Sequence, residues 1–234
     1  MTRDWLRRGL RFLLFVILGF VGLSVLLVLV FRVVPVFGST VMLERKVESW
    51  VSGEPISIQQ QWRPWASLSD NAKLAVIASE DQRFPMHHGF DFNQMQKALD
   101  AWFSGDSLRG ASTISQQTAK NLFLWTGRTW VRKGFEAWFT VLIELLWPKE
   151  RILEVYLNVV EWDSGVFGLE AAAQHYFGVH ADQLTAAQAS RLAAILPNPR
   201  EWSASRPSAY IQQRSQWIRQ QMRQLGGSAY LERL

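Results

Sequence analysis

The chain has 234 residues, of which 48% are hydrophobic, so it is long enough for one substantial domain and an appendage. Its formal net charge of +5 is concentrated at one end, since residues 1–32 hold five arginines and one aspartate and the rest holds 20 basic and 19 acidic residues. A domain this close to neutral is not a nucleic-acid binder on charge, and the lack of cysteine excludes disulfides and thiolate metal sites.

Residues 12–32 are predicted to form a transmembrane helix after a basic tail at residues 1–11. Residues 12–31 contain no charge and, apart from Gly19, Gly22 and Ser24, only Leu, Ile, Val and Phe. A helix of that length spans about 30 Å, the thickness of the hydrocarbon core. A cleaved signal peptide is the alternative, but its apolar region is usually about 7 to 15 residues long. Four arginines before the span and one after it predict a cytoplasmic N-terminus, with the rest of the chain on the outer side of the membrane.

Residues 33–64 have a mixed composition and are predicted to form a juxtamembrane stalk and an entry strand, with a short helix at residues 41–51. Helical signals then dominate residues 65–234, with predicted helices at residues 69–79, 92–103, 112–123, 129–147, 149–160, 169–177, 185–196 and 207–225. Thr185 with Gln188 forms a capping box, and Pro207 fits the first turn of the last helix, with Ser205 near its cap. Clear alternating strands are lacking, so a mainly α domain of packed helices is predicted.

The stretch from Glu80 to Gly89 places two acidic residues where a helix meets a loop. Ser69 and Asp70 are favourable N-cap residues for the preceding helix, and Pro85 with Gly89 stops it. A carboxylate at such a junction can face a cleft while its backbone is held rigidly, as a general base requires. By itself an acidic pair at a helix end is more often a solvated surface feature, so the other motifs decide.

A second stretch, residues 110–121, is dense in hydrogen-bond donors. Ser112 and Thr113 can cap a helix whose first backbone N–H groups then face any nearby anion. Further donors follow over the next turns, namely Gln116, Gln117, Lys120 and Asn121. This density suits a sugar or a phosphate, whereas the plain alternative is a capped helix with a Gln-rich solvent face.

The span from residue 120 to residue 151 is locally basic within the nearly neutral domain. Its charged residues are Lys120, Arg128, Arg132, Lys133, Lys149 and Arg151 against Glu136, Glu144 and Glu150. A pyrophosphate would be attracted to such a region. An exposed ion pair between Arg132 and Glu136, worth about 0.3 to 0.5 kcal/mol, is the simplest interpretation of their spacing. The surrounding helix is largely apolar, however, which favours a partly buried site.

Four ordered motifs then carry a resemblance to a known family. They are Glu80-Asp81-x-x-Phe84-x-x-His87-x-Gly89, Gly110-x-Ser112-Thr113-x-x-Gln116-Gln117-x-x-Lys120-Asn121, Arg132-Lys133-x-x-Glu136 and Ile152-Leu153-Glu154-x-Tyr156-Leu157-Asn158. In order and spacing they resemble the peptidoglycan glycosyltransferases of glycosyltransferase family 51, over about residues 65–205. The form without a transpeptidase domain is the closer resemblance.

The resemblance implies a lysozyme-like, two-lobed, mostly helical fold that polymerises lipid II into β-1,4-linked glycan strands with inversion, releasing undecaprenyl diphosphate at the bacterial inner membrane. Glu80 would be the general base, and Glu136 would assist at the donor pyrophosphate, directly or through a divalent metal such as Mg or Mn. The residues that would hold phosphates and sugars are Lys120, Arg128, Arg132, Lys133, Ser112, Gln116, Gln117 and Asn121. Asp81, Phe84, His87 and Gly89 would fix Glu80 in place.

Other features receive structural interpretations. His87 and His88 are adjacent, and neighbouring residues seldom ligate one ion, so structural roles are favoured. Glu154, Tyr156 and Asn158 are expected to buttress the cleft. Gln188 stands where the family commonly has glutamate, which leaves a capping role. Because the substrate's lipid stays in the bilayer, the lobe from Trp102 to Leu108 is predicted to dip into the membrane.

Two alternative functions remain open from the sequence. A lysozyme-like lytic enzyme would use Glu80 as a general acid, but it has no use for the cluster of Lys120, Arg128 and Arg132. A catalytically silent scaffold would recruit other cell-wall synthases or division proteins through its transmembrane helix. Growth of lipid II into chains would separate the transferase from both.

Overall fold

The structure, a computed structural model, describes residues 2–104, 112–127 and 129–234. The chain divides into two units, Met1–Pro35 and Val36–Leu234. The first unit is one helix, α1 (Thr2–Val33), whose stretch Arg7–Val33 is long and apolar enough to cross a membrane. This helix contains the predicted span at residues 12–32. A signal sequence near an N-terminus would pass the same test of length and composition.

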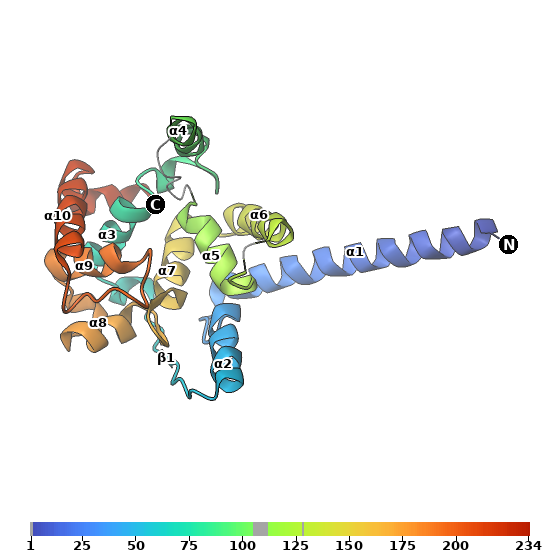
Figure 1. Ribbon diagram of the computed structural model, residues 1–234. Coiled ribbons are helices and arrows are strands. Elements are labelled where there is room, and N and C mark those ends of the chain that lie inside the picture. The colour runs from blue at the N-terminus through green and yellow to red at the C-terminus, as the bar shows by residue number, and fades with distance from the viewer. Residues whose placement is uncertain (1, 105–111, 128) are drawn as a thin grey trace. The chain divides into compact units, whose positions relative to one another are not determined.

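The second unit is mainly helical, which confirms the predicted fold class (Figure 1). Its helices are α2 (Thr40–Ser52), α3 (Asp70–Glu80), α4 (Phe92–Phe103), α5 (Ile114–Phe123), α6 (Trp130–Leu146), α7 (Lys149–Val159), α8 (Leu169–Phe177), α9 (Ala186–Ile195) and α10 (Ala209–Gln224). Short 3₁₀ turns stand between several of them. The likeness to lysozyme stays a prediction.

Two groups of helices form the core. In one group α3 packs against α9 and α10, and in the other α5 packs against α6 and α7 (Figure 1). Both α3 and α7 are buried on nearly all sides, since each residue from Ala72 to Ala78 and from Ile152 to Val159 is at most 9% exposed. These two helices carry Glu80 and Tyr156, so both side chains start from rigid backbone.

A small sheet lies beside the helices. Its first strand falls within residues 33–64, where an entry strand was expected, and its other two strands were not predicted. Its strands are β1 (Gln59–Gln60), β2 (Glu161–Asp163) and β3 (Val166–Phe167), in the order β1-β3-β2. β1 runs parallel to β3 with Gln59 opposite Val166, and β2 runs antiparallel to β3. Strands of two or three residues are too short for an alternating pattern, so hydrophobic periodicity cannot reveal them.

Residues 33–64, predicted as a stalk, belong largely to the compact second unit, which starts at Val36. The Arg45 guanidinium pairs with Glu161 at 3.0 Å, and the backbone N–H of Thr126 donates to Glu44 at 2.9 Å. The Thr40 hydroxyl also donates to the carbonyl of Asn121 at 3.3 Å. The predicted helix at residues 41–51 is therefore real, but long-range contacts that composition cannot reveal fasten it to the end of α5.

The helix caps were predicted with mixed success. Thr185 and Gln188 form the expected capping box at α9. The expected cap of α10 is wrong: Ser208 caps that helix by accepting from the Ile211 N–H at 3.4 Å, and Pro207 precedes the cap. A hydroxyl directly before the first turn reaches the orphan N–H groups, which Ser205 is too far back to do.

Candidate active site

Glu80 is the last residue of α3, and the burial of that helix fixes its backbone. Asp81 leaves helical geometry at φ −159°, and a 3₁₀ turn follows at Phe84–Met86. The Glu80 side chain is 14% exposed, whereas Ala78, half a turn earlier, is fully buried. The carboxylate thus lies at the edge of the core, reachable from outside, as the helix-to-loop junction predicted.

Both carboxylate oxygens of Glu80 have polar partners. Gln117 Nε2, from α5, donates to Oε2 at 3.0 Å, and the adjacent Ser79 hydroxyl donates to Oε1 at 3.1 Å. The Arg214 guanidinium, from α10, lies 3.9 Å from Oε1 and donates to the Ser79 hydroxyl at 3.2 Å. Three helices, α3, α5 and α10, therefore meet at this carboxylate and restrict its orientation.

Tyr156, from α7, orients Gln117. Its hydroxyl donates to Gln117 Oε1 at 3.1 Å, which turns the amide nitrogen toward Glu80. Tyr156 is fully buried, and burial, together with the charge of Glu80, raises the pKa of its hydroxyl well above the ordinary value. The phenol therefore keeps its proton and acts as a fixed donor at any pH at which the chain would work.

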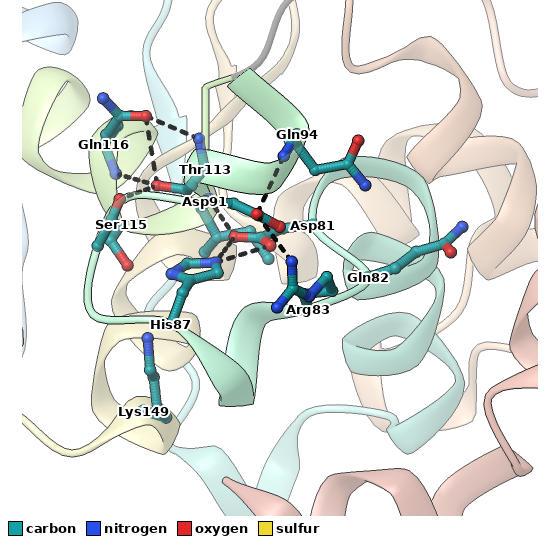
Figure 2. Close-up of polar contacts among 12 residues, drawn as sticks. Asp81, Gln82, Arg83, His87, Asp91, Gln94, Thr113, Ser115, Gln116 and Lys149 are labelled. Carbon is teal, nitrogen blue, oxygen red and sulfur yellow. Dashed lines mark hydrogen bonds and ion pairs between the residues drawn. The ribbon is translucent and has the colours of Figure 1, made fainter. Parts of the chain in front are cut away.

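The loop after Glu80 is held by the buried carboxylate of Asp81 (Figure 2). His87 Nε2 donates to Asp81 at 2.9 Å, and the backbone N–H of Ile114 donates at 3.1 Å. Ile114 begins α5, so Asp81 ties the loop directly to the helix that carries Gln117. This arrangement is the structural role expected for Asp81 and His87.

Gly89 closes the same loop at a position where another residue would be strained. Its φ is +84°, and a Cβ atom there would lie 2.7 Å from the Thr140 side chain of α6. The Thr113 hydroxyl, at the cap of α5, donates to the Gly89 carbonyl at 2.6 Å. Both ends of the loop are therefore attached to α5, which fixes the distance between Glu80 and that helix.

A second cluster of charges lies on α5 and α6. Glu136 is only 3% exposed, and its two oxygens pair with Arg132, at 2.5 Å, and with Lys133. Burial lowers the pKa of the Lys120 ammonium on α5, an effect that the negative charge of Glu136 opposes and the positive charges of Arg132 and Lys133 reinforce. Arg132 and Glu136 thus form the partly buried site that the apolar helix predicted, and a plain surface pair is excluded.

Helix α5 connects the two groups of residues. Gln117 and Lys120 are three residues apart, so they lie on one face of the helix, about 4.5 Å apart along its axis. Gln117 contacts Glu80, while Lys120 interacts with the charges around Glu136. The predicted proton acceptor and the predicted cationic pocket are therefore neighbours across one helical turn.

Comparison with known proteins identifies the family. The model of the Transglycosylase family matches residues 49–223. The chain belongs to the transglycosylase family. A biosynthetic peptidoglycan transglycosylase of Chromohalobacter salexigens is 92% identical over 234 residues, which cover both chains completely. Proteins of the same name from Pseudomonas fluorescens strain Pf0-1 and Stutzerimonas stutzeri are 62% and 61% identical, over 99% and 100% of this chain and 95% of each relative.

Membership of the transglycosylase family makes the chain a glycosyltransferase and confirms the resemblance carried by the four motifs. The match also explains why residues before the first motif pack into the domain, because it begins at residue 49, within α2. It ends at residue 223, within α10, the helix that brings Arg214 to Glu80. The family's domain thus includes the last turn of α2 and nearly all of α10.

The remaining predicted site residues of this transglycosylase have different placements. Gln116 is buried, and its side chain completes the capping box with Thr113, so it shapes the start of α5. Ser112 is exposed and precedes that cap. Asn121 is buried at the end of α5, where its carbonyl accepts from Thr40. Arg128 lies outside the described residues.

The predicted divalent metal has a poor set of protein ligands at Glu136. Both oxygens of that carboxylate are already taken by Arg132 and Lys133, whereas Mg²⁺ needs about six oxygen ligands. Among the described residues, Asp81, His87 and Asp91 form one buried group with ligand spacing. Its charges are already paired, since Arg83 contacts Asp91 at 3.2 Å and His87 contacts Asp81 (Figure 2).

Sequence reasoning missed the partners that hold Glu80 from outside its own motif. Arg214 lies 134 positions after Glu80, on a helix whose sequence shows cap residues but no motif. Tyr156 was expected to buttress the cleft, but its hydroxyl belongs to the chain of hydrogen bonds that ends at Glu80. The signal for Tyr156 was its place in the fourth motif; for Arg214 no local signal exists.

Exposed apolar side chains gather on α4 and α6. Phe92 and Phe103 of α4 are 72% and 78% exposed, and Trp130 and Val131 at the start of α6 are 92% and 67% exposed. Scattered exposed apolar residues are normal, but aromatic side chains this open favour contact with lipid or protein. Of the predicted membrane lobe, the side chain of Trp102 and residues 105–111, Leu108 among them, lie outside the described part.

Proposed function

We propose that the chain is a peptidoglycan glycosyltransferase that polymerises lipid II into β-1,4-linked glycan strands with inversion and releases undecaprenyl diphosphate. One observation carries the proposal: Glu80 is held by Gln117 one turn of α5 away from Lys120, which joins a cluster of charges. A proton acceptor beside a cationic pocket is what transfer from a sugar diphosphate requires. The names of its relatives support the choice of glycan.

Glu80 acts as the general base in this proposal. Its carboxylate takes the proton from the 4-hydroxyl of the acceptor sugar while that oxygen attacks the anomeric carbon of the donor. General base catalysis contributes about 10² to 10⁴ in rate. Ser79 and Gln117 occupy positions on the two oxygens without neutralising the charge, so they set the orientation of the carboxylate and leave it able to accept a proton.

The cationic pocket stabilises the leaving group. Negative charge grows on the diphosphate as the glycosidic bond breaks, and Lys120, Arg132 and Lys133 offer fixed positive charges to it. In the free enzyme Glu136 holds Arg132 and Lys133 in place. An incoming diphosphate competes with Glu136 for these cations, so we assign Glu136 the role of ordering the pocket before the donor binds.

A divalent metal, should one take part, would draw most of its ligands from the diphosphate. Glu136 would be its protein ligand and would have to exchange Arg132 or Lys133 for the ion. Such an ion would neutralise phosphate charge. The residues of this chain already supply three cations for that purpose, so we assign no step to a metal.

We place the chain in the bacterial inner membrane as a single-pass protein, with a cytoplasmic N-terminus and a periplasmic catalytic unit. The apolar stretch of α1 and the arginines before it support this topology. Lipid II and the growing glycan chain are its substrates, and the bilayer delivers the lipid. Other cell-wall synthases or division proteins are proposed partners, bound through the anchor.

The deciding experiment incubates the purified chain with radiolabelled lipid II in vesicles and separates the products by length. We expect long glycan chains from the wild type and none from Glu80→Gln or Glu136→Gln. Glu201→Gln is the matched control, because Glu201 is an exposed acid in a turn away from both clusters. Cleavage of finished glycan without chain growth would support a lytic enzyme, and full activity of Glu80→Gln would refute the assignment of the base.

A further inference from the structure

Helix α2 carries an apolar stripe that no part of the described second unit covers. Leu43, Val47, Trp50 and Val51 are 62%, 50%, 85% and 77% exposed. At 100° per residue these four side chains fall within about 100° of one another, the width of the buried stripe on an ordinary amphipathic helix. A hollow of about 580 Å³ runs along the same face. Its apolar lining is Leu43, Val47 and Val51, and its polar lining is Thr40, Glu44, Glu48 and Ser52.

The opposite side of α2 is firmly attached to the domain. Val41 and Met42 are each only 4% exposed, and Arg45 pairs with Glu161. At the edge of the stripe, Glu44 accepts two hydrogen bonds from Thr126. Because these contacts fix the rotation of the helix, the apolar stripe cannot turn inward. The stripe is therefore always exposed in the folded second unit, and we expect lipid or protein to cover it.

The lipid bilayer is the occupant that the chain itself favours. Six residues separate Val33, the end of α1, from Thr40, the start of α2, and the seven steps between these two residues reach at most about 25 Å. Phe37, within this connection, is 76% exposed, so the sequence between the anchor and the stripe also carries an exposed apolar side chain. Tryptophan is enriched where water meets lipid, and Trp50 is the most exposed member of the stripe.

We propose that α2 lies in the outer interfacial layer of the membrane, with Leu43, Val47, Trp50 and Val51 among lipid headgroups and upper acyl chains. This inference rests on the proposed membrane anchor. A helix with one apolar face and one polar face binds a bilayer in this way. Since α2 is bonded to the end of α5, it would also set the height of Gln117 and Lys120 above the membrane.

Single-cysteine variants test the inference in the full chain, because the sequence contains no cysteine. An environment-sensitive fluorophore is attached at Val51→Cys, at the neighbouring Ser52→Cys, at Leu18→Cys in the span and at the exposed, distant Ser205→Cys. The proteins are placed in vesicles of phosphatidylethanolamine and phosphatidylglycerol, with and without lipids carrying a nitroxide quencher. We expect quenching at position 51 at least twice that at positions 52 and 205.

The four labels separate the failures of the two proposals. Quenching at position 18 with position 51 no more quenched than position 205 would overturn the interfacial placement and leave the anchor intact. Absence of quenching at position 18 would refute the anchor itself. A label at position 51 that is shielded only at high protein density, without quenching by lipid, would indicate a second copy or another protein and would also overturn the inference.

A kinetic readout distinguishes membrane contact from a structural role. We expect Trp50→Glu with Val51→Glu to raise the KM for lipid II in vesicles about fivefold while kcat changes less than twofold. In detergent, where no bilayer exists, the same variant should match the wild type within twofold. Equal losses in vesicles and in detergent would show that the stripe matters for the fold alone.

Discussion

The two sides of the candidate site, which α5 joins, hold their charged groups in opposite ways. On one side Glu80 is held mainly by hydrogen bonds from neutral groups, Gln117 and Ser79, with the Arg214 charge standing off at 3.9 Å. On the other side Glu136 is in direct contact with two cations. A group that must accept a proton is oriented without being neutralised, whereas a group that orders a phosphate pocket is bound to the charges it arranges.

The largest expected effect comes from removing the proton acceptor. Glu80→Gln keeps the size of the side chain and its contact with Ser79, so the fold should persist while polymerisation falls about 10² to 10⁴-fold. The measurement is the initial rate of lipid II consumption beside lipid II binding. Binding should change less than threefold, and a parallel loss of binding and rate would assign Glu80 to substrate recognition instead.

Removing a cation from the other side should weaken binding more than chemistry. Arg132→Met leaves Glu136 with one partner and removes one charge from the pocket, so kcat/KM should fall about 10 to 100-fold. The dependence of KM on salt should also become shallower, because fewer charges attract the diphosphate. A variant with unchanged KM and unchanged salt dependence would place Arg132 outside the donor site.

The hydrogen-bond chain behind Glu80 predicts an intermediate effect. Tyr156→Phe removes one hydroxyl and leaves Gln117 free to turn its amide, so kcat should fall about 3 to 10-fold with KM unchanged. The lost buried hydrogen bond should cost about 1 kcal/mol of stability. Val159→Ala, at a fully buried position also on α7, is the control for stability alone, and an equal loss of kcat there would argue against a positioning role for Tyr156.

The smallest expected effect concerns stability and pH. Burial lowers the pKa of Lys120, so the folded state disfavours its proton and the penalty is present in full below the lowered value. Lys120→Met should therefore raise the melting temperature by about 2 °C near neutral pH. As the pH rises from the lowered pKa of Lys120 toward the ordinary lysine pKa, the unfolded state binds more protons than the folded state. The melting temperature of the wild type should therefore rise toward that of the variant. A difference in melting temperature between Lys120→Met and the wild type that does not change with pH would refute the burial argument.

Much of the fold could be predicted from sequence because its helices carry local signals. Phe92–Phe103 and Leu169–Phe177 were predicted to the residue, since each has apolar periodicity between breakers. The strand pairing could not be predicted because β1 and β3 have two residues each. The packing of α2 could not be predicted because Arg45 and Glu44 find their partners more than 80 positions away. Patterns within a helix cannot report such contacts.

The same distinction between local signals and long-range contacts holds for the candidate site. Glu80, Lys120 and Glu136 could be selected because ordered motifs contain them. The partners that define their chemistry come from other helices: Arg214 from α10 and Tyr156 from α7. Only packing shows that Gln116 serves a cap while its neighbour Gln117 faces Glu80.

Chemical rescue tests most directly whether Glu80 is the base. Glu80→Ala opens space where the carboxylate lay, and added formate can supply a free carboxylate in that space. We predict that single-turnover extension of a glycan chain falls at least 100-fold in this variant and recovers in proportion to formate, which should leave the wild type unaffected. Extension by Glu80→Ala within threefold of the wild-type rate, with no response to formate, would contradict the account.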